Sequence, residues 1–252
     1  MSFFKIKNLD FSYSKKIKII SGISFDVFSG DIVSILGVNG CGKTTIMKNL
    51  IRVLYPSGGC INVNDIDINK MSSLEVAKNI SYVGQFIEKK QLTVLEYILL
   101  GRRPYVKYMA GKTDYEIVDK VIRDLDLTLI SNLFINEISG GQLQKVAIAR
   151  ALAQQPKFIC LDEPTSSLDL RNQLAVLDIV TEYAKKNNIG VIMIIHDINL
   201  ALKYSNKFLL VKDGKVFLFG GVEIINGNNI KKVFGVDVEV IHINGRKIIF
   251  VH

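Results

Sequence analysis

The segment at residues 37–44 reads Gly-Val-Asn-Gly-Cys-Gly-Lys-Thr, the glycine spacing of a phosphate-binding loop. An apolar run at 31–36 predicts a buried strand before it, and apolar periodicity at 46–54 predicts a helix after it. Glycine lets successive N–H groups turn toward one anion, and the helix start adds its positive dipole end. This context predicts a nucleoside triphosphate site in which Lys43 reaches the β- and γ-phosphates and Thr44 reaches magnesium.

The composition is that of a soluble protein with a sizeable core. The chain has 252 residues, of which 48% are apolar and 22% charged, enough for one large or two small domains. Its longest apolar runs are strand-sized, and its N-terminus has no signal-peptide core. Three cysteines at odd spacing form neither a disulfide framework nor a zinc pattern. We therefore expect a cytoplasmic protein.

A net charge of +8 permits nucleic acid or anionic lipid as partners. The lysines, however, are spread along the chain as pairs at 15–16, 89–90, 185–186 and 231–232. They are not interleaved with aromatic residues, as a single-strand-binding surface would require. This pattern favours an ordinary solvated surface, and no nucleic-acid partner is expected.

The order of predicted elements indicates an α/β protein. A β-rich start at 3–36 is followed by a strand at 59–63, a helix-rich middle at about 94–153, and alternating strands and helices to the end. No linker and no internal repeat is evident. Two capping boxes predict helix starts, and two turn dipeptides predict hairpins: Ser72 with Glu75, Thr93 with Glu96, Asp213-Gly214 and Asn244-Gly245.

A second apolar strand, at 158–163, ends in two carboxylates, Asp162 and Glu163. After a phosphate loop this pair fits phosphoryl transfer, because one carboxylate can hold magnesium, directly or through water, while the next handles the attacking water. Asp162 would neutralise part of the ion's charge. Glu163 would act as general base and position the water.

With these motifs in order, the sequence resembles the ATP-hydrolysing subunit of an ATP-binding cassette (ABC) transporter over nearly its whole length. Gln85 in Tyr-Val-Gly-Gln matches the family's Q-loop, Ser139-Gly-Gly-Gln142 its signature, and Ser167-Leu-Asp169 the loop after the carboxylate pair. His196 matches the switch histidine. Tyr13 sits where the family stacks an aromatic ring on adenine.

The resemblance implies the following sites. Catalysis would use Lys43, Gln85, Glu163 and His196, and magnesium would be held by Thr44, Gln85 and Asp162. ATP would contact Tyr13, Gly37, Asn39, Gly40, Cys41, Gly42, Lys43, Thr44, Thr45, Ser139, Gly140, Gly141, Gln142 and Asp169. Taken singly, Gln85 and Tyr13 could equally be ordinary surface or core residues, and a lone histidine after a strand is usually structural.

The resemblance also implies the fold and the partners. The fold would be that of a P-loop ABC ATPase, a single domain at 1–252 with a RecA-like mixed sheet, an antiparallel β subdomain and a helical signature subdomain at about 86–153. Two copies would clamp head to tail around two ATP molecules, each signature serving the other copy's nucleotide. Transmembrane permease subunits and, indirectly, a substrate-binding protein would complete a transporter on the cytoplasmic face of the membrane.

The cargo is less strongly indicated. Residues 92–105 contain Gly101-Arg-Arg-Pro104 and resemble importers of iron-siderophore complexes, haem and cobalamin, but an Arg-rich helix end with a Pro stop explains the same residues. Another ABC importer or an exporter is the alternative. A DNA-repair ATPase of this superfamily would need a long coiled coil between the phosphate loop and the signature, and the sequence shows no sustained heptads there. A translation factor would normally carry two cassettes, and this sequence has one. Both classes are therefore disfavoured.

Cys41 lies inside the phosphate loop. A thiol at an electropositive helix N-terminus should have a lowered pKa and react readily, so we expect alkylation of Cys41 to block ATP binding. The alternative is that the position simply requires a small residue.

Overall fold

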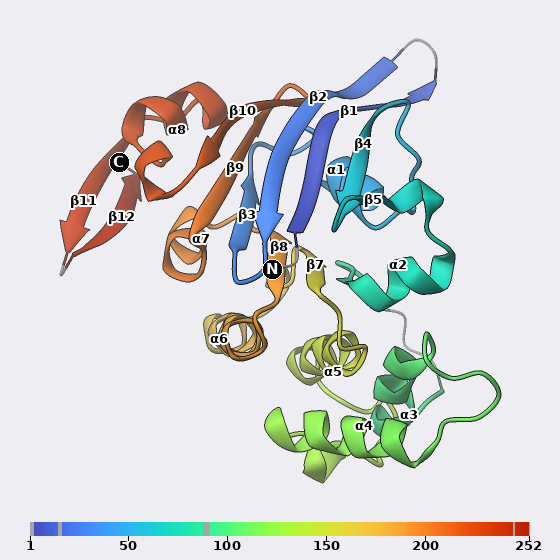
Figure 1. Ribbon diagram of the computed structural model, residues 1–252. Helices are drawn as coiled ribbons and strands as arrows, with labels where there is room; N and C mark the ends of the chain where they lie inside the picture. Colours follow the sequence, from blue (N-terminus) through green and yellow to red (C-terminus); the bar gives the residue numbers. More distant parts are fainter. Residues whose placement is uncertain (1–2, 15–16, 88–90, 244, 252) are drawn as a thin grey trace. The chain divides into compact units, whose positions relative to one another are not determined.

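The computed structural model describes residues 3–14, 17–87, 91–243 and 245–251 (Figure 1). It confirms the predicted α/β class. The chain forms two compact units, one made of Met1–Met71 with Gly190–His252 and the other of Ser72–Ile189. The second unit holds the segment predicted as a helical subdomain at about 86–153, together with two strands. The domain boundaries given above stay a prediction.

The first unit begins with an antiparallel sheet in the order β2-β1-β4-β5. Alternate residues of its strands are buried, as expected for a sheet with one face on the core. The strand predicted at 59–63 is present as β4. The sheet's strands are β1 (Phe3–Ser14), β2 (Ile17–Phe28), β4 (Gly58–Val63) and β5 (Ile66–Asp67).

A second set of strands in this unit has the order β10-β9-β3-β8, with β3 parallel to both β8 and β9. Every residue of β3 and β8 is buried, which explains why the sequence shows unbroken apolar runs there. The strands are β3 (Ile32–Leu36), β8 (Gly190–Ile194), β9 (Lys207–Lys212) and β10 (Lys215–Gly220). The remaining elements are α1 (Lys43–Leu50), η1 (Ile68–Lys70), α7 (Ile198–Tyr204), η4 (Val222–Ile224), α8 (Gly227–Phe234), β11 (Val238–Ile243) and β12 (Arg246–Val251).

The helix after the phosphate loop differs from the prediction at both ends. It begins at Lys43 rather than residue 46 and ends at Leu50 rather than residue 54. Arg52 has φ 55°, a left-handed conformation that cannot continue a helix. Its guanidinium donates to the carbonyl oxygen of Ile68 at 2.8 Å and to that of Met71, a long-range interaction that local periodicity does not encode.

Both predicted hairpins join antiparallel strands. Asp213 and Gly214 connect β9 to β10 with φ angles of 50° and 72°, the positive values that a two-residue turn of type I′ requires. In the other hairpin, Ile243 of β11 pairs with Arg246 of β12. Asn244, the first residue of that predicted turn, lies outside the described residues, as do the lysine pairs at 15–16 and 89–90.

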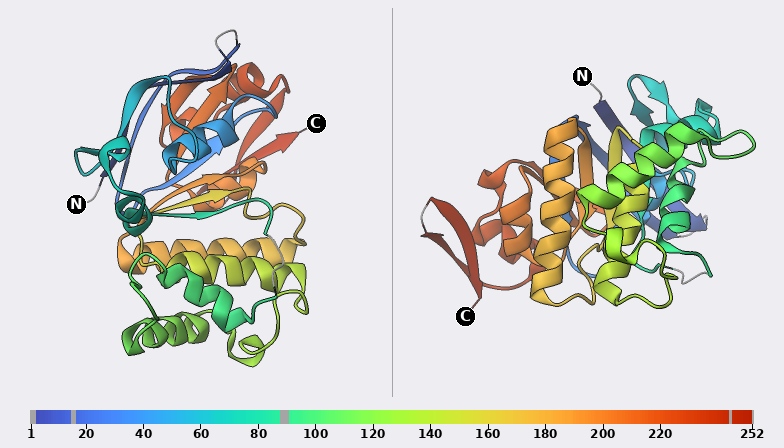
Figure 2. Two further views of the ribbon diagram at one scale, coloured as in Figure 1. Left: turned by 90° about the vertical axis from the view of Figure 1, so that its right-hand side faces the viewer. Right: turned by 90° about the horizontal axis from the view of Figure 1, so that it is seen from below.

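The second unit is mainly helical and contains the parallel strands β6 and β7. Helices α5 and α6 run side by side in both views of Figure 2. The two capping boxes are confirmed, since Ser72 and Thr93 each accept from an N–H three residues on and receive the glutamate in return. The elements are α2 (Ser73–Asn79), β6 (Ile80–Val83), α3 (Val94–Leu99), η2 (Leu100–Arg102), α4 (Lys112–Asp124), η3 (Thr128–Ile130), α5 (Gly140–Ala153), β7 (Phe158–Asp162) and α6 (Leu170–Asn187).

None of the helices in the described part of the chain is long and apolar enough to span a membrane.

Candidate functional site

The phosphate loop connects β3 to α1 and is packed tightly against the end of β9. A Cβ atom added to Gly37 would lie 2.4 Å from the carbonyl oxygen of Val211, so only glycine fits there. The loop is also bonded to the β9–β10 turn, because the N–H of Gly214 donates to the carbonyl oxygen of Cys41 at 3.2 Å. Asn39 and Gly40 at the loop tip are exposed. The loop is thus a supported backbone cradle with an accessible tip.

Lys43 is held over this cradle. Its ammonium donates to the carbonyl oxygens of Gly37 at 2.8 Å and Val38 at 2.9 Å, and the side chain is only 6% exposed. An ammonium has three donors, so these two bonds leave one for a phosphate oxygen. Thr44 is exposed on the first turn of α1, whereas Thr45 is buried.

The prediction of a lowered pKa for Cys41 is wrong. Burial raises the pKa of the Cys41 thiol, and the nearby Lys43 charge only partly offsets that effect. The side chain is 6% exposed and would lie 2.8 Å from a Cβ at position 37. The alternative, a small residue that fits a tight space, therefore describes this position better than a reactive thiolate.

Tyr13 lies near the end of β1 and is 62% exposed. Its ring contacts the buried ring of Phe11 edge to face, with 4.9 Å between centroids and 88° between planes. The contact supports the tyrosine while leaving much of its ring accessible, as stacking on a purine would require. Adenine binding by Tyr13 stays a prediction.

His196 and the phosphate loop leave the same edge of the parallel strands. Ile35 of β3 pairs with Ile194 of β8, and both strands end just before a predicted site segment. Ligands bind at the carboxyl ends of parallel strands in α/β folds. His196 is exposed and directly precedes Asp197, which caps α7 by accepting from the N–H groups of residues 199 and 200. Within this unit the structure therefore brings two predicted site segments to one edge.

In the second unit, β7 ends at Asp162, and Glu163 directly follows the strand rather than ending it as predicted. Asp162 is 3% exposed, and Glu163 has φ 52°, a left-handed backbone conformation that is uncommon for a non-glycine residue. The amide nitrogen Nε2 of Gln85 donates to Oε2 of Glu163 at 2.7 Å. This bond brings together two of the predicted catalytic residues, which lie far apart in the sequence, and orients the Glu163 carboxylate.

The sequence analysis missed Tyr82. Its hydroxyl donates to Oδ2 of Asp162 at 3.4 Å, and burial together with the Asp162 charge raises the pKa of Tyr82 to about 12. The phenol therefore stays protonated at neutral pH and acts as a donor. The sequence shows a tyrosine in the strand that precedes Gln85. It gives no indication that this tyrosine contacts Asp162, which lies 80 residues further along the chain.

The signature residues form the start of α5. Ser139 Oγ accepts from the N–H of Gln142 at 3.3 Å, and Gln142 Oε1 accepts from the N–H of Ser139 at 2.9 Å. The side chain of Gln142 is thus used within the helix cap. Ser139 and Gly140 are exposed, whereas Gly141 is buried against Asn172. A 14-residue helix with an exposed N-terminus and a hydroxyl at its cap can bind an anion.

Asp169 has a local role. Its carboxylate oxygens accept from the backbone N–H of Asn172 at 2.8 Å and from the side-chain amide of the same residue at 2.9 Å, which caps α6. The predicted contact of Asp169 with ATP stays a prediction.

The residues assigned to magnesium supply the oxygen donors that this ion prefers, namely a hydroxyl, an amide oxygen and a carboxylate. Among the described residues, no group of three or more His, Cys, Asp or Glu side chains could hold an ion on its own. Thr44 lies in the first unit, and Gln85 and Asp162 lie in the second.

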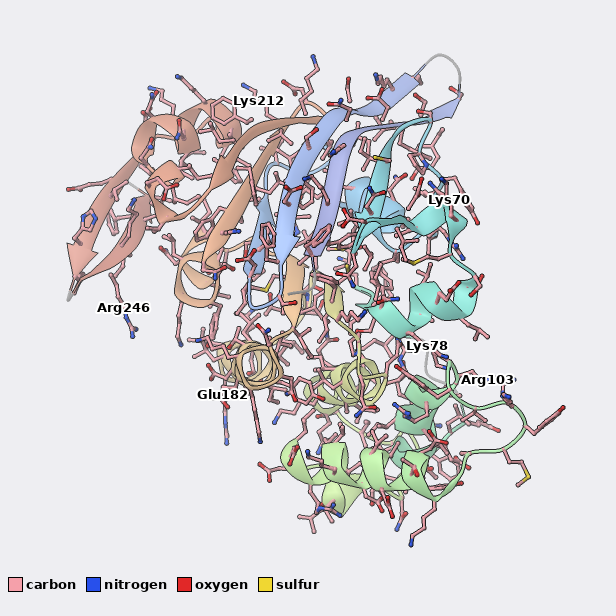
Figure 3. The ribbon with its side chains drawn as sticks, in the orientation of Figure 1. Lys70, Lys78, Arg103, Glu182, Lys212 and Arg246 are labelled. Atoms are coloured by element: carbon pink, nitrogen blue, oxygen red, sulfur yellow. The ribbon has the colours of Figure 1, made fainter. Side chains whose placement is uncertain are left out.

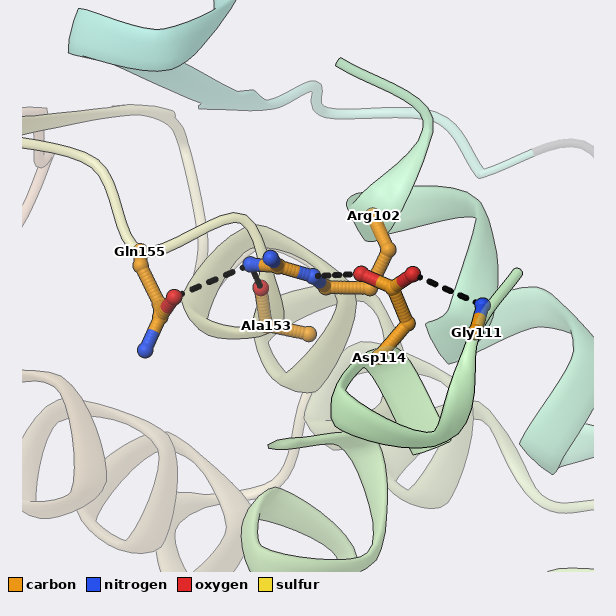
Figure 4. Close-up of polar contacts among 5 residues, drawn as sticks. All are labelled: Arg102, Gly111, Asp114, Ala153 and Gln155. Carbon is orange, nitrogen blue, oxygen red and sulfur yellow. Dashed lines mark hydrogen bonds and ion pairs between the residues drawn. The ribbon is translucent and has the colours of Figure 1, made fainter. Parts of the chain in front are cut away.

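The Gly-Arg-Arg-Pro element at 101–104 has a structural explanation inside the second unit (Figure 4). A Cβ at Gly101 would lie 2.2 Å from the carbonyl oxygen of Arg150, so only glycine allows η2 to approach α5. Arg102 is 4% exposed and donates to Asp114 Oδ1 at 2.9 Å, Ala153 O at 2.9 Å and Gln155 Oε1 at 3.0 Å. The arginine joins the end of α5 to the start of α4.

The Arg102 guanidinium also changes the titration of its partner. Its hydrogen bond, with that from the N–H of Gly111, lowers the pKa of Asp114. The carboxylate therefore stays charged at neutral pH, and this buried pair is a structural feature of the helical region.

Comparison with known proteins identifies the family. The ABC transporter family model matches residues 20–166. The chain is 45% identical to the uncharacterized ABC transporter ATP-binding protein MJ0089 of Methanocaldococcus jannaschii, covering 95% of this chain and 94% of that protein. It is 31% identical to the iron(3+)-hydroxamate import ATP-binding protein FhuC of Bacillus subtilis, covering 96% and 91%.

Two solved structures share the fold. One, assigned to the metal-chelate type of ABC transporter and seen in an inward-facing conformation, matches with a TM-score of 0.85 and 29% identity, covering 100% of this chain and 97% of that one. The other is the dimeric ABC transporter cassette MJ0796, with a TM-score of 0.77 and 28% identity, covering 87% and 98%. With its phosphate loop, carboxylate pair and signature in family order, the chain belongs to the ATP-binding subunits of ABC transporters and is an ATPase.

Proposed function

We propose that this ATPase powers the import of a metal chelate such as an iron-siderophore complex, haem or cobalamin. The observation that carries the proposal is that relatives named for iron-hydroxamate and petrobactin import match along almost the whole chain, covering 96% and 94% of it. The solved structure of the metal-chelate type also matches over its full length. The helical segment that the permease would contact is included in these matches.

The geometry supports a specific division of labour in hydrolysis. Magnesium, when bound with ATP, would supply charge neutralisation at the phosphates, and Thr44 and Asp162 would help to hold it. The Glu163 carboxylate would accept the proton of the attacking water, with Gln85 fixing its orientation through the 2.7 Å hydrogen bond. Lys43 and His196 would bind the γ-phosphate.

We further propose that two copies act together. The exposed Ser139 hydroxyl and the N-terminus of α5 form an anion-binding arrangement suited to the γ-phosphate held by a second copy. The related cassette MJ0796 is dimeric, which supports the pairing of two copies. ATP would then bridge the copies, and loss of phosphate after hydrolysis would release them.

A groove beside Gln85 suits a permease segment. It encloses about 250 Å³ in the second unit, and Phe86 at its rim is 88% exposed. Such an exposed aromatic side chain next to a groove is typical of an interaction site. The groove is lined by Tyr82, Val83, Gly84, Phe86, Ile87, Tyr97, Leu100, Ala147 and Arg150.

The adenine assignment leads to a kinetic prediction. Replacing Tyr13 by Ala should raise KM for ATP by about fivefold, because stacking with an aromatic ring contributes about 1 kcal/mol beyond its area, and should leave kcat nearly unchanged. Steady-state ATPase kinetics would measure both constants. Tyr55→Ala, another exposed tyrosine of the same unit, serves as the control. A large fall in kcat for Tyr13→Ala would contradict simple stacking.

The import proposal is tested by transport. The tagged subunit would be isolated with its membrane partners and reconstituted in vesicles with its binding protein, and uptake of iron-hydroxamate, haem and cobalamin would be compared. ATP-dependent accumulation of one chelate, lost with Glu163→Gln in the same complex, is the expected result. ATP-driven movement of cargo in the opposite direction would identify an exporter, and uptake of a metal-free solute alone would identify another importer class. Either would overturn the proposal.

A further inference from the structure

The loop that connects η2 to α4, residues 103–111, exposes aromatic, apolar and basic side chains together, and we call it the basic aromatic loop. Tyr108 is 93% exposed, Met109 87% and Tyr105 38%. Arg103 and Lys107 are exposed as well. Figure 3 labels Arg103 at the start of the loop, whose outer side chains project away from the ribbon. Single exposed apolar side chains are common, but a group of them on one short loop can mark a binding surface.

The base of this loop is firmly fixed. The buried Arg102 and the partly buried Asp114, which flank the loop, are joined by the 2.9 Å ion pair of Figure 4, and Asp114 also accepts from the N–H of Gly111 at 3.0 Å. Tyr105 packs its ring 4.1 Å from the Arg102 guanidinium, and its N–H donates to the Arg102 carbonyl oxygen at 2.8 Å. The exposed tip is therefore presented from a rigid support.

The basic aromatic loop and the residues on either side of it carry only positive charge. Residues 97–113 contain no Asp or Glu, whereas Arg103, Lys107 and Lys112 carry positive charge beside the tip. The carboxylate of Asp114 is engaged by Arg102. Lys112 lies 3.9 Å from Glu116, but both side chains are largely exposed, so this pair neutralises little. A partner with fixed negative charge and an apolar layer would complement this surface.

We propose that the basic aromatic loop contacts anionic lipid headgroups at the membrane surface. Lysine and arginine near an anionic leaflet are attracted to its phosphates, and tyrosine prefers the boundary between headgroups and acyl chains. Met109 supplies an apolar side chain able to enter that boundary. The proposal rests on the proposed transporter role, which places the subunit beside a membrane. A nucleic-acid surface would instead need a row of stacking residues, and this loop offers one nearly fully exposed ring.

The sequence provides a direct reporter because the chain contains no tryptophan. The variant Tyr108→Trp places a single fluorophore at the loop tip of the intact subunit. With vesicles containing equal parts of phosphatidylglycerol and phosphatidylcholine, we expect its emission to shift to shorter wavelength. We expect little shift with phosphatidylcholine alone. The matched control is Tyr55→Trp, because Tyr55 is 64% exposed in the other unit and should report no insertion.

Charge-matched variants separate loop binding from attraction of the whole cationic protein. In the Tyr108→Trp background, Lys107→Gln with Lys112→Gln should weaken binding to the anionic vesicles by about twenty-fivefold, at about fivefold per cation. Lys70→Gln with Lys215→Gln removes the same charge from exposed positions of the first unit and should have a much smaller effect. Vesicle sedimentation would give the affinities.

The results separate this proposal from the transport function. No spectral shift at position 108, equal losses for the two lysine pairs, or a shift at position 108 only when the purified permease is added would each overturn the lipid contact. These vesicles contain no permease and the experiment needs no ATP, so failure of the lipid contact leaves the import proposal standing. Failure of chelate transport likewise leaves the vesicle result unchanged.

Discussion

Replacing Glu163 by Gln is expected to reduce ATP turnover by roughly 10²- to 10⁴-fold, the range that a positioned general base contributes. The amide has nearly the size of the carboxylate, and its oxygen can still accept the Gln85 hydrogen bond, so the local geometry should persist. Only the ability to take the water proton is lost. Steady-state turnover with saturating Mg-ATP measures the effect.

The same variant should reveal the dimer. Because hydrolysis no longer removes the shared phosphate contacts, we expect light scattering to show a monomer without nucleotide and a dimer with Mg-ATP. The control is Glu182→Gln, the same chemical change at an exposed position of α6 that Figure 3 labels, which should leave turnover unchanged. Undiminished hydrolysis by Glu163→Gln would remove Glu163 from the role of base. If the variant binds ATP yet stays monomeric, either the dimer needs the membrane partners or the proposed dimer is wrong, and measuring the same variant after co-purification with those partners decides between the two.

Replacing Arg102 by Met should lower the free energy of unfolding by about 3 kcal/mol, because removing one partner of a buried ion pair leaves the other charge uncompensated. The side chains of Arg102 and Asp114 are only 5% and 14% exposed. Arg102→Met also removes the donors to Ala153 and Gln155. Chemical denaturation of the intact subunit would measure the loss, and Arg103→Met, an exposed neighbour, should cost little.

The pH dependence provides an independent check on this ion pair. The pKa of Asp114 is lowered in the folded protein, so its ionised form stabilises the fold above the ordinary Asp pKa, and this contribution is lost as pH falls through the lowered value. The stability gap between wild type and Arg102→Met should therefore be full at neutral pH and shrink below about pH 4. A constant gap across that range would show that packing of the arginine stem, rather than its charge, accounts for the loss.

What the sequence predicted correctly was local. The phosphate loop, the capping boxes at Ser72 and Thr93 and the turn at Asp213-Gly214 each depend on residues a few positions apart, and each is present. The predicted lowering of the Cys41 pKa was wrong because it left out burial, which is a property of the folded chain and raises that pKa. The prediction considered only the positive helix N-terminus beside the thiol and not the residues that cover it in the fold.

What the sequence could not predict involved distant partners. Arg102 meets acceptors 12, 51 and 53 residues away, so the sequence alone left it as the end of a helix or as a family element. Tyr82 donates a hydrogen bond to Asp162, 80 residues further along the chain. Arg52, just after α1, donates to the carbonyl oxygen of Ile68, which follows β5. Such contacts follow from packing, which periodicity does not report.

The hydrogen bond between Gly214 and Cys41 makes the β9–β10 turn a support of the phosphate loop. The turn is tied on its other side to β2, since its Gly214 carbonyl oxygen accepts from the N–H of Ser21 at 2.8 Å. Three segments separated by most of the chain length thus brace one another around the phosphate loop. A genetic screen for weakened ATP binding should therefore return substitutions near residues 20 and 214 that do not contact the nucleotide. These substitutions would act by removing the support of the phosphate loop.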